Sequence, residues 1–469
     1  MSSDFDAMAV AQMRDLIDRR EISPVDLTRR SLERAEATRA SLNAFSFLRP
    51  EAAMAEARAA EAAVLRGDRL GPLHGIPVSV KDLIALKDAP FASGSRAMAD
   101  NVAAVDAPSV ERVRRAGAIV IGKTTTSEFG CKAVGDSPLT GITRHPWNLA
   151  KTPGGSSAGA AASVAAGITP LALGTDGGGS LRIPAALTGL VGFKAQAGRV
   201  PVWPTSATPT LAHVGALART VADAALLTSV IAGYDPRDPF SVAGPVPDLA
   251  AACRASSLEG LRVAWSPTLG YARPDEHVVA VARAATDTIG RLGAAVEEVD
   301  AVFDRDPCDI WTAEFYAGVG TRLKGVLETR RALLDPAVAD VLDAALRQEM
   351  TAYYETVFRR YALRDDMRRF FERYDILLSP TLPVSSLDVG KNVPDGLPDR
   401  TIVSWVFYTY PFNLTGQPAA SICAGFGSDG MPVGLQIVGR PHGEADVLRV
   451  AAAFEATQPA GYNLRPFVA

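Results

Sequence analysis

Two glycine-rich stretches of this chain carry serines, and a lysine lies upstream of both. The first stretch, Thr152 to Gly159, contains two serines, the second, Gly174 to Pro184, contains Ser180, and the lysine is Lys81. A serine hydroxyl becomes a strong nucleophile only when a base removes its proton, and a buried, neutral lysine can be that base. Glycines let successive backbone N–H groups converge on one point, as an oxyanion hole requires. These residue types predict a serine hydrolase that works without histidine.

The motifs around these residues resemble those of the amidase signature enzymes, serine hydrolases that cleave carboxamides through a Ser-cisSer-Lys triad. The resemblance covers nearly the whole chain and is weakest between about residues 236 and 375. The motifs that carry it are Gly71 to Asp82, Gly122 to Thr124, Glu128 with Phe129, Pro146 to Asn148, the two glycine-serine stretches, Asn413 to Ser421 and Gly430 to Gly439. It implies an α/β fold: a single domain over residues 1–469, with α-helices on both faces of a mixed, multi-stranded β-sheet.

Position by position, the resemblance implies a role for each candidate catalytic residue. Lys81 corresponds to the base, Ser156 to the serine at an unusual cis peptide bond, and Ser180 to the nucleophile. The family's oxyanion hole falls on the backbone N–H groups of four successive residues, Gly177, Gly178, Gly179 and Ser180. The resemblance implies no metal and no organic cofactor.

Gly177 departs from the family pattern, which has a branched residue or a threonine at this position. The departure places three glycines in a row. An extra glycine costs up to ~1 kcal/mol of backbone entropy on folding. We therefore expect either a less rigid oxyanion loop or a wider pocket beside it.

Two aromatic segments, Trp311 to Tyr316 and Trp405 to Phe412, predict an apolar pocket for acyl or aryl groups. Cys131 and Lys132 follow a motif that the family uses to line its substrate channel, although core packing would explain them equally well. The candidate substrate-binding residues are Cys131, Lys132, Trp311, Phe315, Tyr316, Val406, Tyr408 and Phe412. The expected substrates are small-molecule amides, esters or carbamates (urethanes).

Three other functions fit parts of the pattern. The A subunit of the tRNA-dependent amidotransferase has the same triad, but it holds the glutamine ammonium with an acidic residue where this chain has Val406 among aromatic residues. Gly155 to Gly159 matches the G-x-S-x-G elbow of an α/β-hydrolase-like esterase, with Ser157 as nucleophile, but no buried strand precedes it. A catalytically inactive binding protein on the same scaffold is disfavoured because all three triad residues are present.

Several other polar residues have a structural interpretation beside a functional one. Gly117 to Thr124 fits a phosphate-loop pattern, but its apolar centre is typical of a buried strand, so Lys123 is predicted to end that strand. Two interpretations are open for Arg182: its guanidinium binds a carboxylate of the substrate, or it forms a buried ion pair within the protein. Two interpretations are also open for Asp82 and Asp176: each orients an element of the candidate site, or each orders the loop in which it lies.

Composition and charge narrow the class of protein. The chain has 469 residues, a formal net charge of −4 and a pI near 5.9, which give no reason to expect nucleic acid or an anionic membrane surface. Its four cysteines are widely spaced, which predicts neither disulfides nor a zinc site. The N-terminus lacks the pattern of a signal peptide, and no run approaches the ~20 apolar residues of a membrane span. We expect a cytoplasmic monomer or homodimer.

Hydrophobic patterning predicts the elements that must position the candidate site. The N-terminal part, residues 1–70, is predicted to be helical, with helical patterns over residues 4–66. The core that contains the triad motifs follows at 71–235. A largely helical part at 236–375 precedes a return to the sheet at 376–469. The predicted strands are 76–80, 118–121, 168–173, 261–265, 295–299, 376–378, 420–422 and 435–438.

Overall fold

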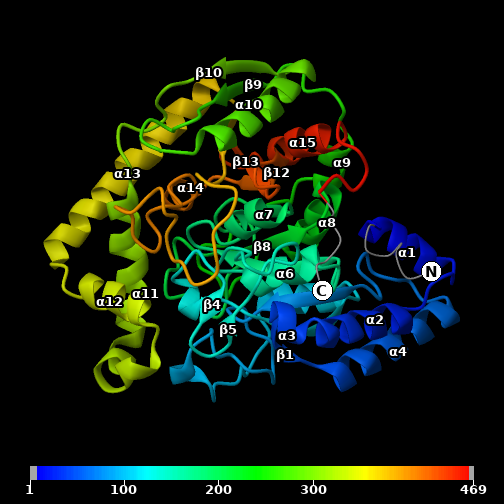
Figure 1. Ribbon diagram of the computed structural model, residues 1–469. Helices are drawn as coiled ribbons and strands as arrows, with labels where there is room; N and C mark the ends of the chain where they lie inside the picture. The colour runs from blue at the N-terminus through cyan, green and yellow to red at the C-terminus, as the bar shows by residue number, and fades with distance from the viewer. Residues whose placement is uncertain (1–7, 464–469) are drawn as a thin grey trace.

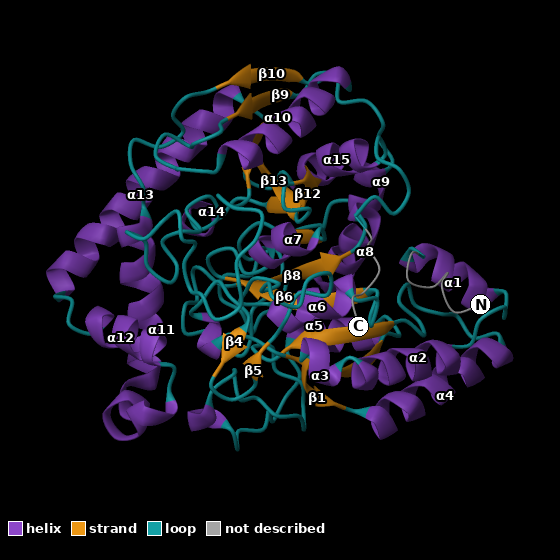
Figure 2. Ribbon diagram, viewed as in Figure 1, coloured by secondary structure: helices purple, strands orange, loops and turns teal. Residues whose placement is uncertain are grey.

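Eleven strands form one mixed sheet in the order β1-β3-β2-β6-β8-β7-β12-β13-β11-β9-β10. The structure is a computed structural model in which residues 8–463 are described. Figures 1 and 2 show the sheet extending from β1, low in the view, past β8 near the centre to β9 and β10 at the top, with helices around it. The strands are β1 (Phe45–Leu48), β2 (Pro77–Lys81), β3 (Ile119–Thr124), β6 (Leu171–Asp176), β7 (Val191–Lys194), β8 (His213–Ala218), β9 (Arg262–Trp265), β10 (Ala295–Glu298), β11 (Ile376–Pro380), β12 (Ala419–Phe426) and β13 (Pro432–Gly439). The predicted α/β fold is confirmed.

The N-terminal part is helical apart from one strand. Its helices are α1 (Val10–Asp18), α2 (Pro24–Ala37), α3 (Arg39–Leu42) and α4 (Pro50–Arg66). The Ser23 hydroxyl caps α2 by accepting a hydrogen bond from the Val25 N–H at 2.9 Å. The prediction of helices throughout residues 4–66 is wrong at Phe45–Leu48, because these residues pair antiparallel with β3 as the edge strand β1. Residues 4–7 lie outside the described part of the chain.

Between the two halves of the sheet is a part of the chain whose last three main helices, within residues 308–373, lie along one side of the molecule, whereas its first, residues 276–291, lies beside β9 (Figure 1). Its main helices are α10 (Glu276–Arg291), α11 (Cys308–Arg330), α12 (Pro336–Ala345) and α13 (Met350–Arg373). Most residues between 308 and 373 are helical. Helix α11 has buried apolar residues at every fourth position, and four of them, Trp311, Phe315, Val319 and Leu323, line the two spaces described below.

Two neighbouring parallel strands bring the candidate site residues together. Strands β2 and β6 pair in register from Val78 opposite Leu171 to Val80 opposite Leu173. Because the carboxyl ends of parallel strands meet at one edge of a sheet, Lys81 and the loop after Asp176 lie close together. Strand β6 extends three residues beyond its predicted end, which carries Thr175 and Asp176 to that edge. The serine stretches lead into α6 (Ala158–Ala165) and α7 (Arg182–Thr188).

Within residues 8–463, no helix combines the length and apolar character needed to cross a membrane. The four cysteines are not joined by disulfides. Among the same residues, no cluster of three or more His, Cys, Asp or Glu has a geometry that could hold a metal ion. A separate two-stranded ribbon, β4 (Asp136–Ser137) with β5 (Gly141–Ile142), lies beside the main sheet.

Candidate active site

Lys81, Ser156 and Ser180 form a continuous chain of polar contacts. Lys81 Nζ lies 2.7 Å from Ser156 Oγ, and Ser156 Oγ lies 2.8 Å from Ser180 Oγ. The peptide bond between Gly155 and Ser156 is cis. Lys81 is fully buried, whereas Ser180 is 9 % exposed and borders a cavity. The arrangement can move a proton from Ser180 through Ser156 to Lys81.

The Lys81 amine is buried beside hydroxyl groups. Besides Ser156, it contacts Thr175 Oγ1 at 2.8 Å. Burial lowers the pKa of Lys81 well below its ordinary value, and the charge of Asp176 opposes this only in part. The buried amines of Lys123 and Lys132, by contrast, each lie within 3.3 Å of a carboxylate. Lys81 therefore remains a proton acceptor at a lower pH than an exposed lysine does.

Asp176 is held by Arg182, and the two form a buried ion pair. The guanidinium contacts both carboxylate oxygens at 3.0 Å. Burial alone would raise the pKa of Asp176, but the charge and hydrogen bonds of Arg182 outweigh it and hold the pKa well below its usual value. Arg182 also donates to Thr409 O, Gln436 Oε1 and Asn413 Oδ1. Of its two sequence interpretations, the structure supports the ion pair.

The glycine-rich loop offers three free backbone donors, where the sequence predicted four. The Gly179 N–H donates to Asp176 Oδ1 at 2.7 Å, so that prediction is wrong for Gly179. The N–H groups of Gly177, Gly178 and Ser180 have no hydrogen-bond acceptor within residues 8–463. These three N–H groups form the candidate oxyanion hole. Asp176 thus orders the loop, as one of its two interpretations held.

Helix α11 packs onto the outside of this loop. The Trp311 indole N–H donates to Gly177 O at 2.7 Å, and Thr409 Oγ1 donates to Gly178 O at 2.6 Å. The Phe315 ring stacks on Trp311 with centroids 4.4 Å apart. A Cβ on Gly177 would lie 2.8 Å from Phe315 Cε2, so the ring fills the space that the missing side chain leaves. The expected wider pocket at Gly177 is therefore not observed, and two hydrogen bonds hold the loop.

A cavity of about 340 Å³ opens beside Ser156 and Ser180. Its walls are mainly apolar and come from the loop after β2, from residues 201–208 and from α11. Among the described residues that line it, Asp176 is the only carboxylate, and that carboxylate is paired with Arg182. The cavity therefore suits an uncharged, apolar group.

The predicted substrate-binding residues divide into three groups. Phe315 lines the large cavity. A much smaller space on another side of Ser180 is lined by Cys131, Lys132, Trp311, Phe315 and Val406. The remaining three predicted side chains line neither space and have core contacts instead: Tyr316 donates to Cys131 O, Tyr408 to Pro267 O, and Phe412 packs on Phe303. We do not include these three in the candidate site.

Sequence reasoning missed several residues of the site. Thr175 was overlooked because β6 was predicted to end at residue 173, although it lies inside the second glycine-serine motif. Val319 and Leu323 line the large cavity one and two turns after Phe315. Their spacing of four along a predicted helix was the available signal.

Ser157 has contacts that argue against a nucleophilic role. Its buried hydroxyl donates to Thr175 O at 3.1 Å and accepts from the Thr175 N–H at 3.3 Å. The hydroxyl thereby ties the serine loop to strand β6. It also makes no capping hydrogen bond to α6.

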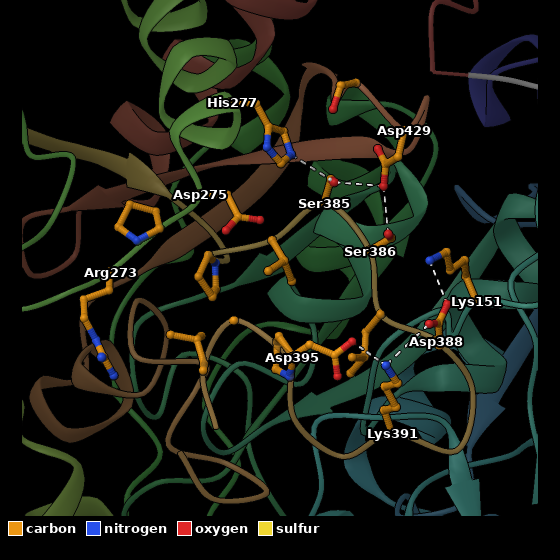
Figure 3. Close-up of a pocket in the computed structure, with 18 residues that line it drawn as sticks. Lys151, Arg273, Asp275, His277, Ser385, Ser386, Asp388, Lys391, Asp395 and Asp429 are labelled. Atoms are coloured by element: carbon orange, nitrogen blue, oxygen red, sulfur yellow. Dashed lines mark hydrogen bonds and ion pairs between the residues drawn. The ribbon is translucent and has the colours of Figure 1, made fainter. Parts of the chain in front are cut away.

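A second pocket, of about 480 Å³, contains serine, histidine and aspartate side chains in another arrangement (Figure 3). Ser385 lies between the other two: His277 Nε2 is 3.2 Å from its Oγ, and that Oγ donates to Asp429 Oδ2 at 3.0 Å. In a catalytic triad the histidine would lie between serine and carboxylate. The proton of Ser385 instead points to Asp429, so this pocket is not a nucleophile site.

Comparisons with known proteins agree with this geometry. The family model described as Amidase matches residues 26–448. An acylamidase of Rhodococcus erythropolis is 36% identical over 462 residues, 96% of each chain. The A subunit of the glutamyl-tRNA(Gln) amidotransferase of Chloroflexus aggregans (strain MD-66 / DSM 9485) is 37% identical over 459 residues, 93% of each chain.

Solved structures give the same result. A bacterial aryl acylamidase of the amidase signature family matches with a TM-score of 0.91 at 30% identity, covering 97% of this chain and 98% of that one. A 6-aminohexanoate cyclic dimer hydrolase, solved with its substrate, matches with a TM-score of 0.89 at 28% identity over 99% of both chains. The chain belongs to the Amidase family, whose members are amidase signature enzymes. It is an amidohydrolase, an enzyme that hydrolyses carbon–nitrogen bonds.

Replacing the buried amine of Lys81 should change how stability depends on pH. Between the lowered pKa of native Lys81 and ~10.4 in the unfolded chain, the unfolded state binds a proton that the native state does not, so the lysine contributes instability that fades as pH rises. Lys81→Met should therefore gain stability relative to wild type at pH 7, and lose that advantage toward pH 10. Urea unfolding at several pH values measures this difference. The control, Lys123→Met, leaves Asp82 buried without its partner and should destabilise.

The indole N–H of Trp311 should be needed for catalysis more than for binding. Trp311→Phe removes the hydrogen bond to Gly177 O and frees the peptide that carries the Gly178 N–H, so kcat should fall about 10- to 100-fold with little change in KM. Steady-state kinetics on a chromogenic amide give both constants. Trp265→Phe is the matched control, because that buried indole N–H has no hydrogen-bond partner within the described residues. Equal effects of the two substitutions would rule out the positioning role.

Proposed function

We propose that this amidohydrolase acts through an acyl-enzyme on Ser180, with Ser156 and Lys81 as the proton relay. The observation that carries the proposal is the chain of contacts from Lys81 Nζ through Ser156 Oγ to Ser180 Oγ, which ends at an apolar cavity beside three free backbone N–H groups. Nucleophile, base and oxyanion donors are thus close to one point.

In the first step Ser180 Oγ forms a bond to the carbonyl carbon of the amide. Its proton passes to Ser156 Oγ while Ser156 gives its own proton to the neutral Lys81 amine. The carbonyl oxygen becomes an oxyanion that accepts hydrogen bonds from the N–H groups of Gly177, Gly178 and Ser180. Lys81 is then charged, and its contact with Thr175 Oγ1 stabilises the ammonium.

In the second step the carbon–nitrogen bond breaks. The nitrogen takes the Ser156 proton, and Lys81 reprotonates Ser156. The amine then departs, and the acyl group remains bound to Ser180 as an ester. Water then attacks this ester and gives its proton to the same relay. Ser180 recovers its proton as the carboxylic acid departs, and the site returns to its starting protonation state.

The lining of the cavity supports an apolar amide over glutamine. A bound glutamine would bring an ammonium and a carboxylate close to Ser180. Among the described residues, the large cavity offers one carboxylate, already paired, and the exposed Arg322, and the small space beside it offers Lys132, which is already paired with two carboxylates. Val406, at the position of the acidic residue expected of an amidotransferase A subunit, is fully buried among aromatic side chains. Leaving either charge unpaired there would cost several kcal/mol.

Esters and carbamates fit the same proposal. Both present a carbonyl carbon to Ser180 and differ from an amide in the atoms attached to that carbon. The relay protonates an alkoxide as readily as an amine, because the Ser156 hydroxyl is not specific for nitrogen. We therefore include aryl esters and urethanes among the substrates to be tested.

Labelling tests the nucleophile. A fluorophosphonate should attach to Ser180, and Ser180→Ala should lose both the label and at least ~10³-fold in kcat. Peptide mass spectrometry of the labelled enzyme identifies the modified residue. Ser157→Ala is the matched control and should keep the label, since the Ser157 hydroxyl contacts backbone. A label on Ser157 would instead support an α/β-hydrolase elbow.

A second measurement tests the substrate class. The purified enzyme should hydrolyse anilides with a kcat/KM at least ~10³-fold above that for glutamine, because burying an unpaired charge costs several kcal/mol. Val406→Asp should weaken anilide hydrolysis about tenfold or more by placing a carboxylate near the acyl group. Val406→Asn, of similar volume, separates the effect of charge from that of shape. Faster hydrolysis of glutamine than of anilides would favour the amidotransferase function.

A further inference from the structure

Ser180 lies between two spaces of very different size. The large cavity has a volume of about 340 Å³, whereas the small space has about 10 Å³, which is room for about one water molecule. Gly130, Phe315 and Ser180 line both spaces, so the reacting hydroxyl sits where they meet. A carbonyl carbon attached to Ser180 carries an acyl group and a leaving amine. We infer that each space receives one of these two groups.

Ser156 determines which group lies on which side. Its side chain borders the large cavity and does not border the small space. In the proposed mechanism, on which this inference rests, Ser156 protonates the leaving nitrogen and must lie within hydrogen-bond distance of it. The leaving amine therefore extends into the large cavity. The acyl group points into the small space.

The walls of the small space are packed side chains of the core. Ile183, Val403 and Val406 are at most 5 % exposed, and Trp311 is fixed by its hydrogen bond to Gly177 O. Lys132 also lines the space, but its ammonium is paired with Asp136 and Asp335. Close-packed walls of this kind resist enlargement, because extra methylene groups force neighbouring side chains out of their preferred rotamers.

We propose that the enzyme selects amides of short-chain acids with bulky, apolar amines, such as N-aryl acetamides. The small space accommodates the methyl group of an acetyl but not a longer chain. The large cavity accommodates the aryl ring and its substituents. By the same geometry, an N-aryl carbamate is accepted when its alkoxy group is short.

The test is a series of 4-nitroanilides with acetyl, propionyl, butyryl and benzoyl groups, hydrolysed by the full-length enzyme. We expect kcat/KM to fall at least tenfold from acetyl to butyryl. Val406→Ala enlarges the small space and should raise the butyryl-to-acetyl ratio about tenfold. Val319→Ala makes the same substitution in the wall of the large cavity and should leave this ratio unchanged, while altering the preference between 4-nitroaniline and larger aryl amines.

Two results would overturn the size selection while leaving the proposed function intact. One is faster hydrolysis of octanamide or benzamide, which release ammonia from a bulky acid, than of the acetyl anilide, because that reverses the two groups. The other is an unchanged kcat/KM across the acyl series in an enzyme whose Ser180 is labelled by fluorophosphonate. Absence of both label and hydrolysis would instead refute the proposed function, and the inference with it.

Discussion

The burial of the Lys81 amine without a carboxylate of its own is the constraint on which the site depends. Carboxylates in contact with a buried lysine favour its charged form: burial would lower the pKa of Lys132, but Asp136 and Asp335 outweigh it and raise that pKa. Burial lowers the pKa of Lys81 and the charge of Asp176 opposes this, but both oxygens of that carboxylate are paired with Arg182. The arginine therefore has an indirect role, since it pairs with a carboxylate that would otherwise stabilise the charged form of Lys81, the proposed base.

The same ion pair joins parts of the chain that are far apart in sequence. Asp176 ends strand β6 and orders the glycine-rich loop, while Arg182 begins helix α7 and reaches the C-terminal segment at Thr409, Asn413 and Gln436. Helix α11, from the helical part between them, covers the outer face of the loop. The glycine-rich loop, Lys81 and the cavity walls thus come from one packed unit, and contacts from several of its parts hold the loop that carries the proposed oxyanion donors.

The sequence singled out Lys81, Ser156 and Ser180, which the structure brings into contact, and it predicted most of the sheet, because glycine-serine motifs and short apolar runs are local signals. It failed at β1, β7 and β8. Strands β7 and β8 contain glycine and alanine within short segments and have little β-branched character, so their sheet positions depend on neighbouring strands. The two aromatic segments were predicted to line a pocket, but a sequence pattern cannot distinguish a pocket wall such as Phe315 from a core side chain such as Phe412. The engagement of the Gly179 N–H by Asp176 likewise depends on tertiary geometry.

The four-residue repeat along α11 has a consequence for how the enzyme acquires new substrates. Trp311 and Phe315 pack against the glycine-rich loop, whereas Val319 and Leu323, further along the same face, line the large cavity and not the small space. Mutations near the start of the helix are therefore expected to change both the substrate range and the turnover rate. Mutations one or two turns later are expected to change the substrate range alone. Both natural divergence and directed evolution are therefore expected to change substrate range most readily at Val319 and Leu323, where substitutions leave the glycine-rich loop in place.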